Sequence, residues 1–245
     1  MKLELIKDKE GLEIKKIDFV CDGGLHDKLN DYEYTKSCNT HRFYYIVAPP
    51  ASGKSSLVQN FFSNRKFFKK VFTHIYYFSP SSTSLKDDIF NKLPEHKRFM
   101  ELNKENLTSV LNTIGSLDKT EKSMIVFDDV ISAFKGNKEL LVDFQKMILN
   151  RRHQGGGISI MVISQVYNLL PLQLRKAVTH LILLNPRTRE LNLVNEEYFN
   201  LDPKNVKKIK DFFFDKQYNF LTYLPDTNTY FKNFDKVTIQ EEEEE

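Results

Sequence analysis

The 245-residue sequence lacks any apolar run near the ~20 residues that a membrane-spanning helix needs, and its first residues lack the apolar core of a secretion signal. It has no tryptophan and only two cysteines, Cys21 and Cys38, which do not form a C-x-x-C pair. We therefore expect an intracellular protein with reduced thiols. His26 and His41 lie near the cysteines, but the spacing matches no zinc-binding pattern, so a metal site is the less favoured interpretation.

The charge of the chain is unevenly distributed. The formal net charge is only +3, because five acidic residues form the terminal run Glu241 to Glu245. Removing those five negative charges leaves +8 for residues 1–240. A basic body suits a nucleic-acid partner, and it also suits plain solubility.

The length and composition favour one folded domain with a sizeable core, since 40% of the residues are hydrophobic and 20 are phenylalanine. Residues 1–41 are expected to hold edge strands and a polar loop, and residues 42–190 the core. Residues 191–240 should form a helix and a β-hairpin. The acidic run at 241–245 is expected to be disordered.

The most informative stretch is a short apolar run, residues 44–47, that breaks into a loop ending in Gly-Lys-Ser before a helical pattern begins. In a phosphate-binding loop, successive backbone N–H groups and the positive end of the following helix dipole face the phosphates. Lys54 would reach the β- and γ-phosphates, and the Ser55 hydroxyl would ligate Mg²⁺. Ala48 replaces the first glycine of the usual pattern, where it only ends the strand. The residues expected around the phosphates are Pro49, Pro50, Ala51, Ser52, Gly53, Lys54, Ser55 and Ser56.

A second motif follows about seventy residues later, where the apolar run 124–127 ends in Asp128 and Asp129. This pattern predicts a buried parallel strand with carboxylates at its C-terminal end, where open α/β sheets place their ligands. Asp128 would hold Mg²⁺ through its water shell. ATPases with a phosphate-binding loop usually carry, at the position of Asp129, a glutamate that orients the attacking water. The aspartate side chain is one methylene shorter than that glutamate.

The run 158–164 predicts a further buried strand, and it ends at Gln165. We expect Gln165 to lie beside the Asp128 strand and to hydrogen-bond the γ-phosphate or the water, although a glutamine there can also serve as a cap or turn residue. Arg151, Arg152 and Arg175 are candidates for an arginine finger that acts on a neighbouring subunit. The alternative for each is a surface salt bridge or a DNA-phosphate contact.

A basic stretch with aromatic residues follows the helix after the phosphate loop. Arg65, Lys66, Lys69 and Lys70 surround Phe67-Phe68. Basic residues interleaved with aromatics can bind nucleic acid. A solvated helix end is an equally good interpretation.

Together the motifs resemble those of the genome-packaging ATPases of large double-stranded DNA viruses, virophages and related transposons. This poxvirus-type family belongs to the FtsK–HerA superfamily. The resemblance covers about residues 42–190 and lies in the segments 48–55, 125–130, 150–154 and 163–165, with Leu-Pro-Leu-Gln-Leu-Arg at 170–175.

The resemblance implies an additional-strand P-loop NTPase: an α/β fold with a mainly parallel sheet flanked by helices. It also implies ATP and Mg²⁺ as cofactors and a homo-oligomeric ring, a pentamer or hexamer. Such a motor drives double-stranded DNA, held by its backbone, into a preformed capsid in the virion or viral factory. Of the three arginines, Arg152 and Arg175 are the expected catalytic residues, and the sequence leaves open which arginine acts in trans. A P-loop helicase, a nucleic-acid kinase subunit and a nucleotide-gated DNA-binding scaffold with weak hydrolysis remain as alternatives.

Overall fold

The computed structural model describes residues 29, 32–38, 41–80 and 89–238. The predicted edge strands near the N-terminus and the run of glutamates at the C-terminus lie outside these residues.

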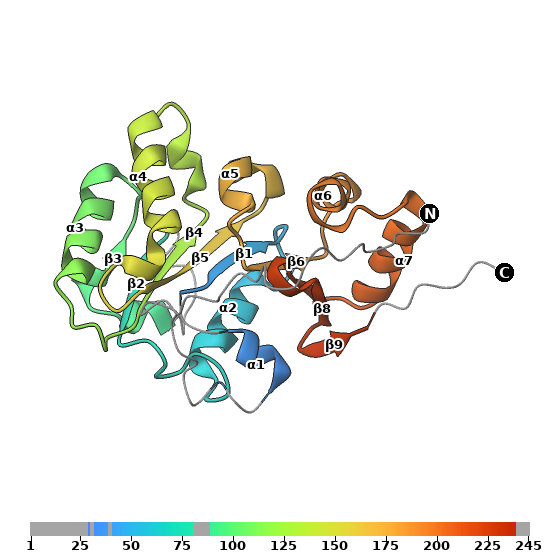
Figure 1. The fold of residues 1–245 in the computed structure, drawn as a ribbon, viewed down its shortest axis with the longest axis horizontal. Coiled ribbons are helices and arrows are strands. Elements are labelled where there is room, and N and C mark those ends of the chain that lie inside the picture. The colour runs from blue at the N-terminus through green and yellow to red at the C-terminus, as the bar shows by residue number, and fades with distance from the viewer. Residues whose placement is uncertain (1–28, 30–31, 39–40, 81–88, 239–245) are drawn as a thin grey trace, which may run out of the picture.

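One sheet organises the described part of the chain (Figure 1), with the strand order β3-β2-β4-β5-β1-β6-β7-β8-β9. The six strands from β3 to β6 in this order run parallel, and β7, β8 and β9 continue the sheet antiparallel. The strands are β1 (Phe43–Val47), β2 (His74–Phe78), β3 (Arg98–Phe99), β4 (Ser123–Asp128), β5 (Ile158–Ser164), β6 (His180–Leu184), β7 (Phe220–Leu224), β8 (Thr229–Lys232) and β9 (Asp235–Val237).

Strand β1 lies at the centre of the nine-stranded sheet, between β5 and β6, and all five of its residues are buried. Successive side chains on a strand point to opposite faces of the sheet. Phe43, Tyr45 and Val47 accordingly belong to one hydrophobic core cluster, whereas Tyr44 and Ile46 belong to the other. The strand therefore connects two cores, one on each face.

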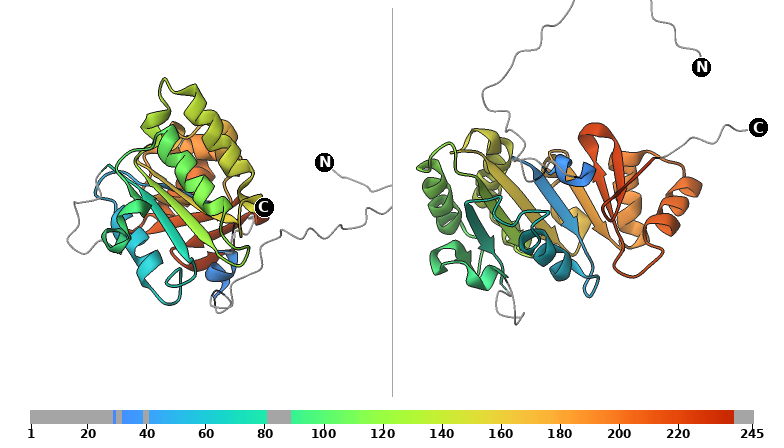
Figure 2. Two further views of the ribbon diagram at one scale, coloured as in Figure 1. Left: turned by 90° about the vertical axis from the view of Figure 1, so that its left-hand side faces the viewer. Right: turned by 90° about the horizontal axis from the view of Figure 1, so that it is seen from below.

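Helices cover both faces of the sheet, as the two views in Figure 2 show. The β1 face with Tyr44 packs against α1 and α2, and the opposite face packs against the helices from α3 to α7. The helices are α1 (Glu33–Ser37), α2 (Lys54–Ser63), α3 (Lys104–Gly115), α4 (Lys138–Leu149), α5 (Leu172–Arg175), α6 (Thr188–Val194) and α7 (Pro203–Phe213), with a π-helical turn at Asn195–Phe199.

These features confirm the predicted α/β class with a mainly parallel sheet, and the predicted C-terminal hairpin is β7 and β8. The two aromatic residues of the basic stretch after α2 pack into the core. Phe67 and Phe68 are 8% and 1% exposed and belong to the core beside α2. Hydrophobic burial therefore explains the two aromatic residues of this stretch.

Candidate nucleotide-binding site

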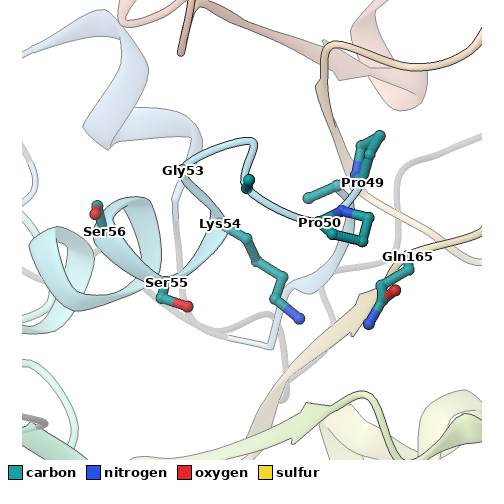
Figure 3. A pocket seen from close by; sticks show the side chains of 9 residues that line it. Pro49, Pro50, Gly53, Lys54, Ser55, Ser56 and Gln165 are labelled. Carbon is teal, nitrogen blue, oxygen red and sulfur yellow. The ribbon is translucent and has the colours of Figure 1, made fainter. Parts of the chain in front are cut away.

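The loop between β1 and α2 curls around a small cavity of about 140 Å³ (Figure 3), and its lining includes most of the predicted phosphate-binding residues. The loop is closed by hydrogen bonds from the Ser52 N–H and hydroxyl to the Pro49 carbonyl, 3.3 and 2.7 Å long. Helix α2 starts directly at Lys54, so its N-terminal N–H groups face the same space. The cavity is lined by Ala48, Pro49, Pro50, Ala51, Gly53, Lys54, Ser55, Ser56 and Gln165.

Gly53 is required by the backbone at the turn into α2. Its φ is +91°, a conformation that side-chain-bearing residues rarely adopt. A Cβ atom there would also lie only 2.9 Å from Cδ1 of Tyr218, in the turn before β7. The Gly in the Gly-Lys-Ser motif thus allows both the bend of the loop and the close approach of an aromatic ring.

Lys54 joins the phosphate loop to the acidic end of β4. Its ammonium group lies 3.1 Å from Oδ1 of Asp128 and 2.5 Å from Oδ2 of Asp129. Burial opposes the charged form of Lys54, but the two carboxylates outweigh it and raise the pKa of this lysine above its usual value. The two motifs, seventy-five residues apart in sequence, thus form one charged cluster.

The Asp128 carboxylate is held by one further group that the motifs did not predict. The Tyr77 hydroxyl, on the neighbouring strand β2, donates a hydrogen bond of 3.1 Å to its Oδ2. Burial is the main cause that raises the pKa of Asp128, and Lys54 acts against that rise. The strand register, which places Tyr77 beside Val126 of β4, was needed to identify this contact.

The other oxygen of Asp128 has the character of a cation ligand. Oδ1 is buried, and the Lys54 ammonium lies 3.1 Å from it. A buried carboxylate oxygen at the sheet edge that also carries the phosphate loop suits Mg²⁺, which takes oxygen ligands and retains water. Ser55, at the start of α2, supplies a hydroxyl in the lining of the phosphate cavity. The residues therefore fit the predicted metal set of Ser55 and Asp128.

Gln165 lies at the same edge, because β5 pairs with β4 in parallel and both strands end there. Its Nε2 donates a 3.0 Å hydrogen bond to Oδ2 of Asp129. Figure 3 shows Lys54 and Gln165 approaching one another from α2 and from the end of β5. The structure thus brings Lys54, Asp128, Asp129 and Gln165 together in one place.

The arginines lie in different environments. Arg151 is buried and donates hydrogen bonds to the carbonyls of His41 and Ile148. Arg152 is exposed in the same 3-10 turn, Arg151–His153. Both precede β5, so they lie at the edge where the parallel strands begin, opposite to the edge that carries Lys54.

Arg175 belongs to a buried polar cluster that sequence reasoning missed. Its guanidinium forms two hydrogen bonds to Glu197, 2.6 and 2.9 Å long, and a third to the Leu170 carbonyl. The Tyr167 hydroxyl donates to the same Glu197, and its ring lies 4.9 Å from the guanidinium carbon. Only the fold shows this partner, because Glu197 lies twenty-two residues away in the π-helical turn.

Comparisons with known proteins identify the fold. A scan against protein-family models finds no match, and a search of curated proteins finds none. Among solved structures, B204, the DNA-packaging ATPase of Sulfolobus turreted icosahedral virus, matches with a TM-score of 0.58 at 17% identity. The match covers 80% of this chain and 98% of B204.

Two further structures give the same result. The B204 genome-packaging NTPase of Sulfolobus turreted icosahedral virus 2 in complex with AMPPCP has a TM-score of 0.59 at 16% identity, over 79% of this chain and 97% of that chain. The pCW3 conjugation coupling protein TcpA with ATPγS has a TM-score of 0.55 at 13% identity, over 80% of this chain and 60% of TcpA.

The chain thus has the fold of a P-loop NTPase, with the phosphate loop between the central strand β1 and α2. The solved structures that share this fold include viral genome-packaging ATPases, in agreement with the resemblance in sequence. Among the described residues, no helix is both long enough and apolar enough to cross a membrane.

Proposed function

We propose that the protein is a Mg²⁺-dependent ATPase that drives double-stranded DNA into a viral capsid. The observation that carries the ATPase assignment is the position of the Lys54 ammonium, between Asp128 and Asp129 at the mouth of the phosphate loop. A loop, a lysine and two carboxylates at one sheet edge form the charge arrangement that phosphoryl transfer needs.

The nucleoside triphosphate binds with its phosphates against the loop residues 49–56. Lys54 then leaves the Asp129 carboxylate and pairs with phosphate oxygens instead. Ser55 and Asp128 would hold the Mg²⁺ ion, which would supply neutralisation of charge on the β- and γ-phosphates. Tyr77 fixes the Asp128 carboxylate through its 3.1 Å hydrogen bond. These residues supply the binding part of the mechanism.

Asp129 and Gln165 supply the part that acts on water. Once Lys54 turns to the phosphates, Oδ2 of Asp129 is released to accept a proton from the attacking water, while Gln165 orients that water. The water oxygen bonds to the γ-phosphorus and the bond to the β–γ bridging oxygen breaks, so that ADP and phosphate leave. An arginine of the neighbouring subunit stabilises the charge that develops.

For this arginine, exposure and position favour Arg152 over Arg175. The guanidinium of Arg175 is committed to Glu197 within its own chain, and its side chain is only 10% exposed. Arg152 is exposed, and it lies at the sheet edge opposite to its own phosphate loop. That position excludes a role in its own site and is compatible with a role in the site of the next subunit of a ring.

The packaging role is supported by the motif resemblance and by the common fold with B204. In this role the protein forms a ring of five or six copies and holds duplex DNA by its phosphate backbone, without reading bases. The capsid vertex is the docking partner, and the virion or the viral factory is the site of action.

The first experiment measures phosphate release with and without duplex DNA for the wild type, Lys54→Ala and Lys104→Ala. Lys104 is an exposed lysine paired with Glu139 on a helix away from the loop, so it is a matched control for the loss of a lysine. We expect Lys54→Ala to abolish DNA-stimulated turnover and Lys104→Ala to retain it. Wild-type turnover in Lys54→Ala would exclude the proposed site.

A second experiment separates the motor from its alternatives. Displacement of a third strand from intact duplex DNA, dependent on ATP, supports translocation on duplex. Unwinding of a forked duplex without such displacement would instead indicate a helicase. ATP binding without phosphate release, whether or not duplex DNA is present, would indicate a nucleotide-gated scaffold.

A further inference from the structure

A second and larger hollow lies directly beside the phosphate loop. It has a volume of about 720 Å³, within the size range of small-molecule sites, and shares Ala51, Gly53 and Ser56 with the phosphate cavity. The rest of its lining comes from α2 and the segment after it, the end of β6, the turn before β7 with the start of β7, and the turn between β8 and β9. These further residues are Leu57, Asn60, Asn64, Phe67, Leu184, Tyr218, Phe220 and Phe234.

The positions of the two hollows fix the direction in which a bound nucleotide would extend. Lys54, Asp129 and Gln165 mark the end of the phosphate cavity where the γ-phosphate belongs. The nucleoside must then leave at the opposite end, and Ser56 lies on the side of the α2 N-terminus away from Gln165 (Figure 3). The larger hollow opens on that side.

The walls of this hollow are suited to an aromatic ring. Tyr218 is 58% exposed, and its ring lies against Gly53, so it is held beside the loop yet remains accessible. No ring–ring contact among the described residues includes Tyr218. Its backbone φ of 69° belongs to the left-handed region, which is uncommon for a tyrosine. Such backbone conformations are concentrated at ligand-binding sites.

Polar groups that could read the edge of a base are few. Of the two asparagines, Asn60 donates its amide to the Ser56 carbonyl, and Asn64 accepts a hydrogen bond from the Lys66 N–H. Each therefore has one position of its side-chain amide engaged within its own segment. A site without a set of dedicated hydrogen-bonding partners discriminates between ligands only weakly.

From these observations we infer that the hollow binds the base and ribose of the nucleotide, with the base stacked on Tyr218 and with little selection between purines. This inference rests on the proposed nucleotide site and adds to it the subsite that anchors the base. Stacking on an aromatic side chain tolerates any base, because each base presents a π-face.

The test is calorimetric titration of the full chain with Mg·ATP, Mg·GTP and Mg·tripolyphosphate, which has no base. The variants are Tyr218→Ala, Tyr218→Phe and the control Phe212→Ala, which removes another exposed aromatic ring from α7. We expect Tyr218→Ala to weaken ATP and GTP binding about 5- to 100-fold and to leave tripolyphosphate binding unchanged. Tyr218→Phe and Phe212→Ala should bind all three ligands as the wild type does.

The remaining outcomes contradict the inference in distinguishable ways. Wild-type ATP affinity in Tyr218→Ala would place the base elsewhere, and loss of tripolyphosphate binding in that variant would show that Tyr218 shapes the phosphate loop. A more than 100-fold preference for ATP over GTP would exclude stacking as the basis of recognition. If the wild type bound neither ATP nor tripolyphosphate, the nucleotide site itself would be overturned, and the base subsite with it.

Discussion

Gln165 and Asp129 are joined by a 3.0 Å hydrogen bond across the ends of two adjacent strands. The backbone of Asp129 is left-handed, with φ of 55°, and its N–H is bonded to the Ile163 carbonyl of β5. The turn after β4 therefore aims the second aspartate at the end of β5. This geometry makes the pair a unit, because the group proposed to accept the proton of the attacking water is hydrogen-bonded to the group proposed to orient that water.

The first prediction concerns Asp129. Asp129→Asn keeps the shape of the side chain but removes the proton acceptor, so we expect kcat to fall by about 10²- to 10⁴-fold. ATP affinity should change only a few-fold, because Lys54 and the loop remain. Single-turnover hydrolysis and equilibrium binding measure the two quantities separately.

Asp129→Glu is the matched variant, since it restores the longer acid usual in such ATPases. Activity within about tenfold of the wild type would agree with the proposed role. Full activity of Asp129→Asn would refute it and would transfer water activation to another group.

A second prediction concerns Tyr77, which bonds Asp128 across strands β2 and β4. Partners that orient a metal-ligating carboxylate typically contribute 10- to 100-fold to metal affinity. We expect Tyr77→Phe to shift the Mg²⁺ concentration needed for half-maximal turnover upward by about tenfold while maximal turnover changes little. Tyr76→Phe, on the neighbouring position facing the opposite core, is the control. An unchanged Mg²⁺ titration would mean that Asp128 needs no support from Tyr77.

The contrast between Lys54 and Arg175 shows which parts of the site the sequence can predict. Lys54, Asp128 and Gln165 each follow a distinctive strand, and parallel strands place such residues at one edge by their geometry alone. Arg175 has no such constraint, because its partner Glu197 comes from a π-helical turn whose approach depends on tertiary packing. Tyr218 is similar, since only the fold brings the turn before β7 against the phosphate loop.

The third prediction tests the structural role of Arg175. Removing one partner of a buried ion pair leaves the other charge unpaired, so we expect Arg175→Ala to lower the free energy of unfolding by about 3 kcal/mol. Arg152→Ala should change it by less than about 0.5 kcal/mol, because Arg152 is exposed. Urea unfolding measures both values.

The Arg152→Ala variant also tests the assignment of the arginine finger. Arg152→Ala is expected to fold normally and to lose most of the DNA-stimulated turnover of the assembled ring. Full turnover in this variant would remove Arg152 from the trans site.

The last prediction concerns how the free energy of unfolding depends on pH, and it is argued from His180. This histidine is almost fully buried at the start of β6, with Thr179 and Ser37 hydrogen-bonded to its ring nitrogens. Burial, assisted by the charge of Arg42, lowers its pKa to about 3. Burial also lowers the pKa of His41, so both histidines act in the same direction.

The sign follows from proton binding. Between about pH 3 and pH 6.5 the unfolded chain binds a proton at position 180 and the folded chain does not, so stability is complete above pH 6.5 and is lost as the pH falls. From pH 7 to pH 5 the loss from this one group is about 2 kcal/mol. His180→Gln keeps hydrogen-bonding groups but cannot titrate, and its unfolding free energy should therefore decline less steeply over this range. Parallel pH profiles of the wild type and the variant would show that His180 is not kept neutral by the fold.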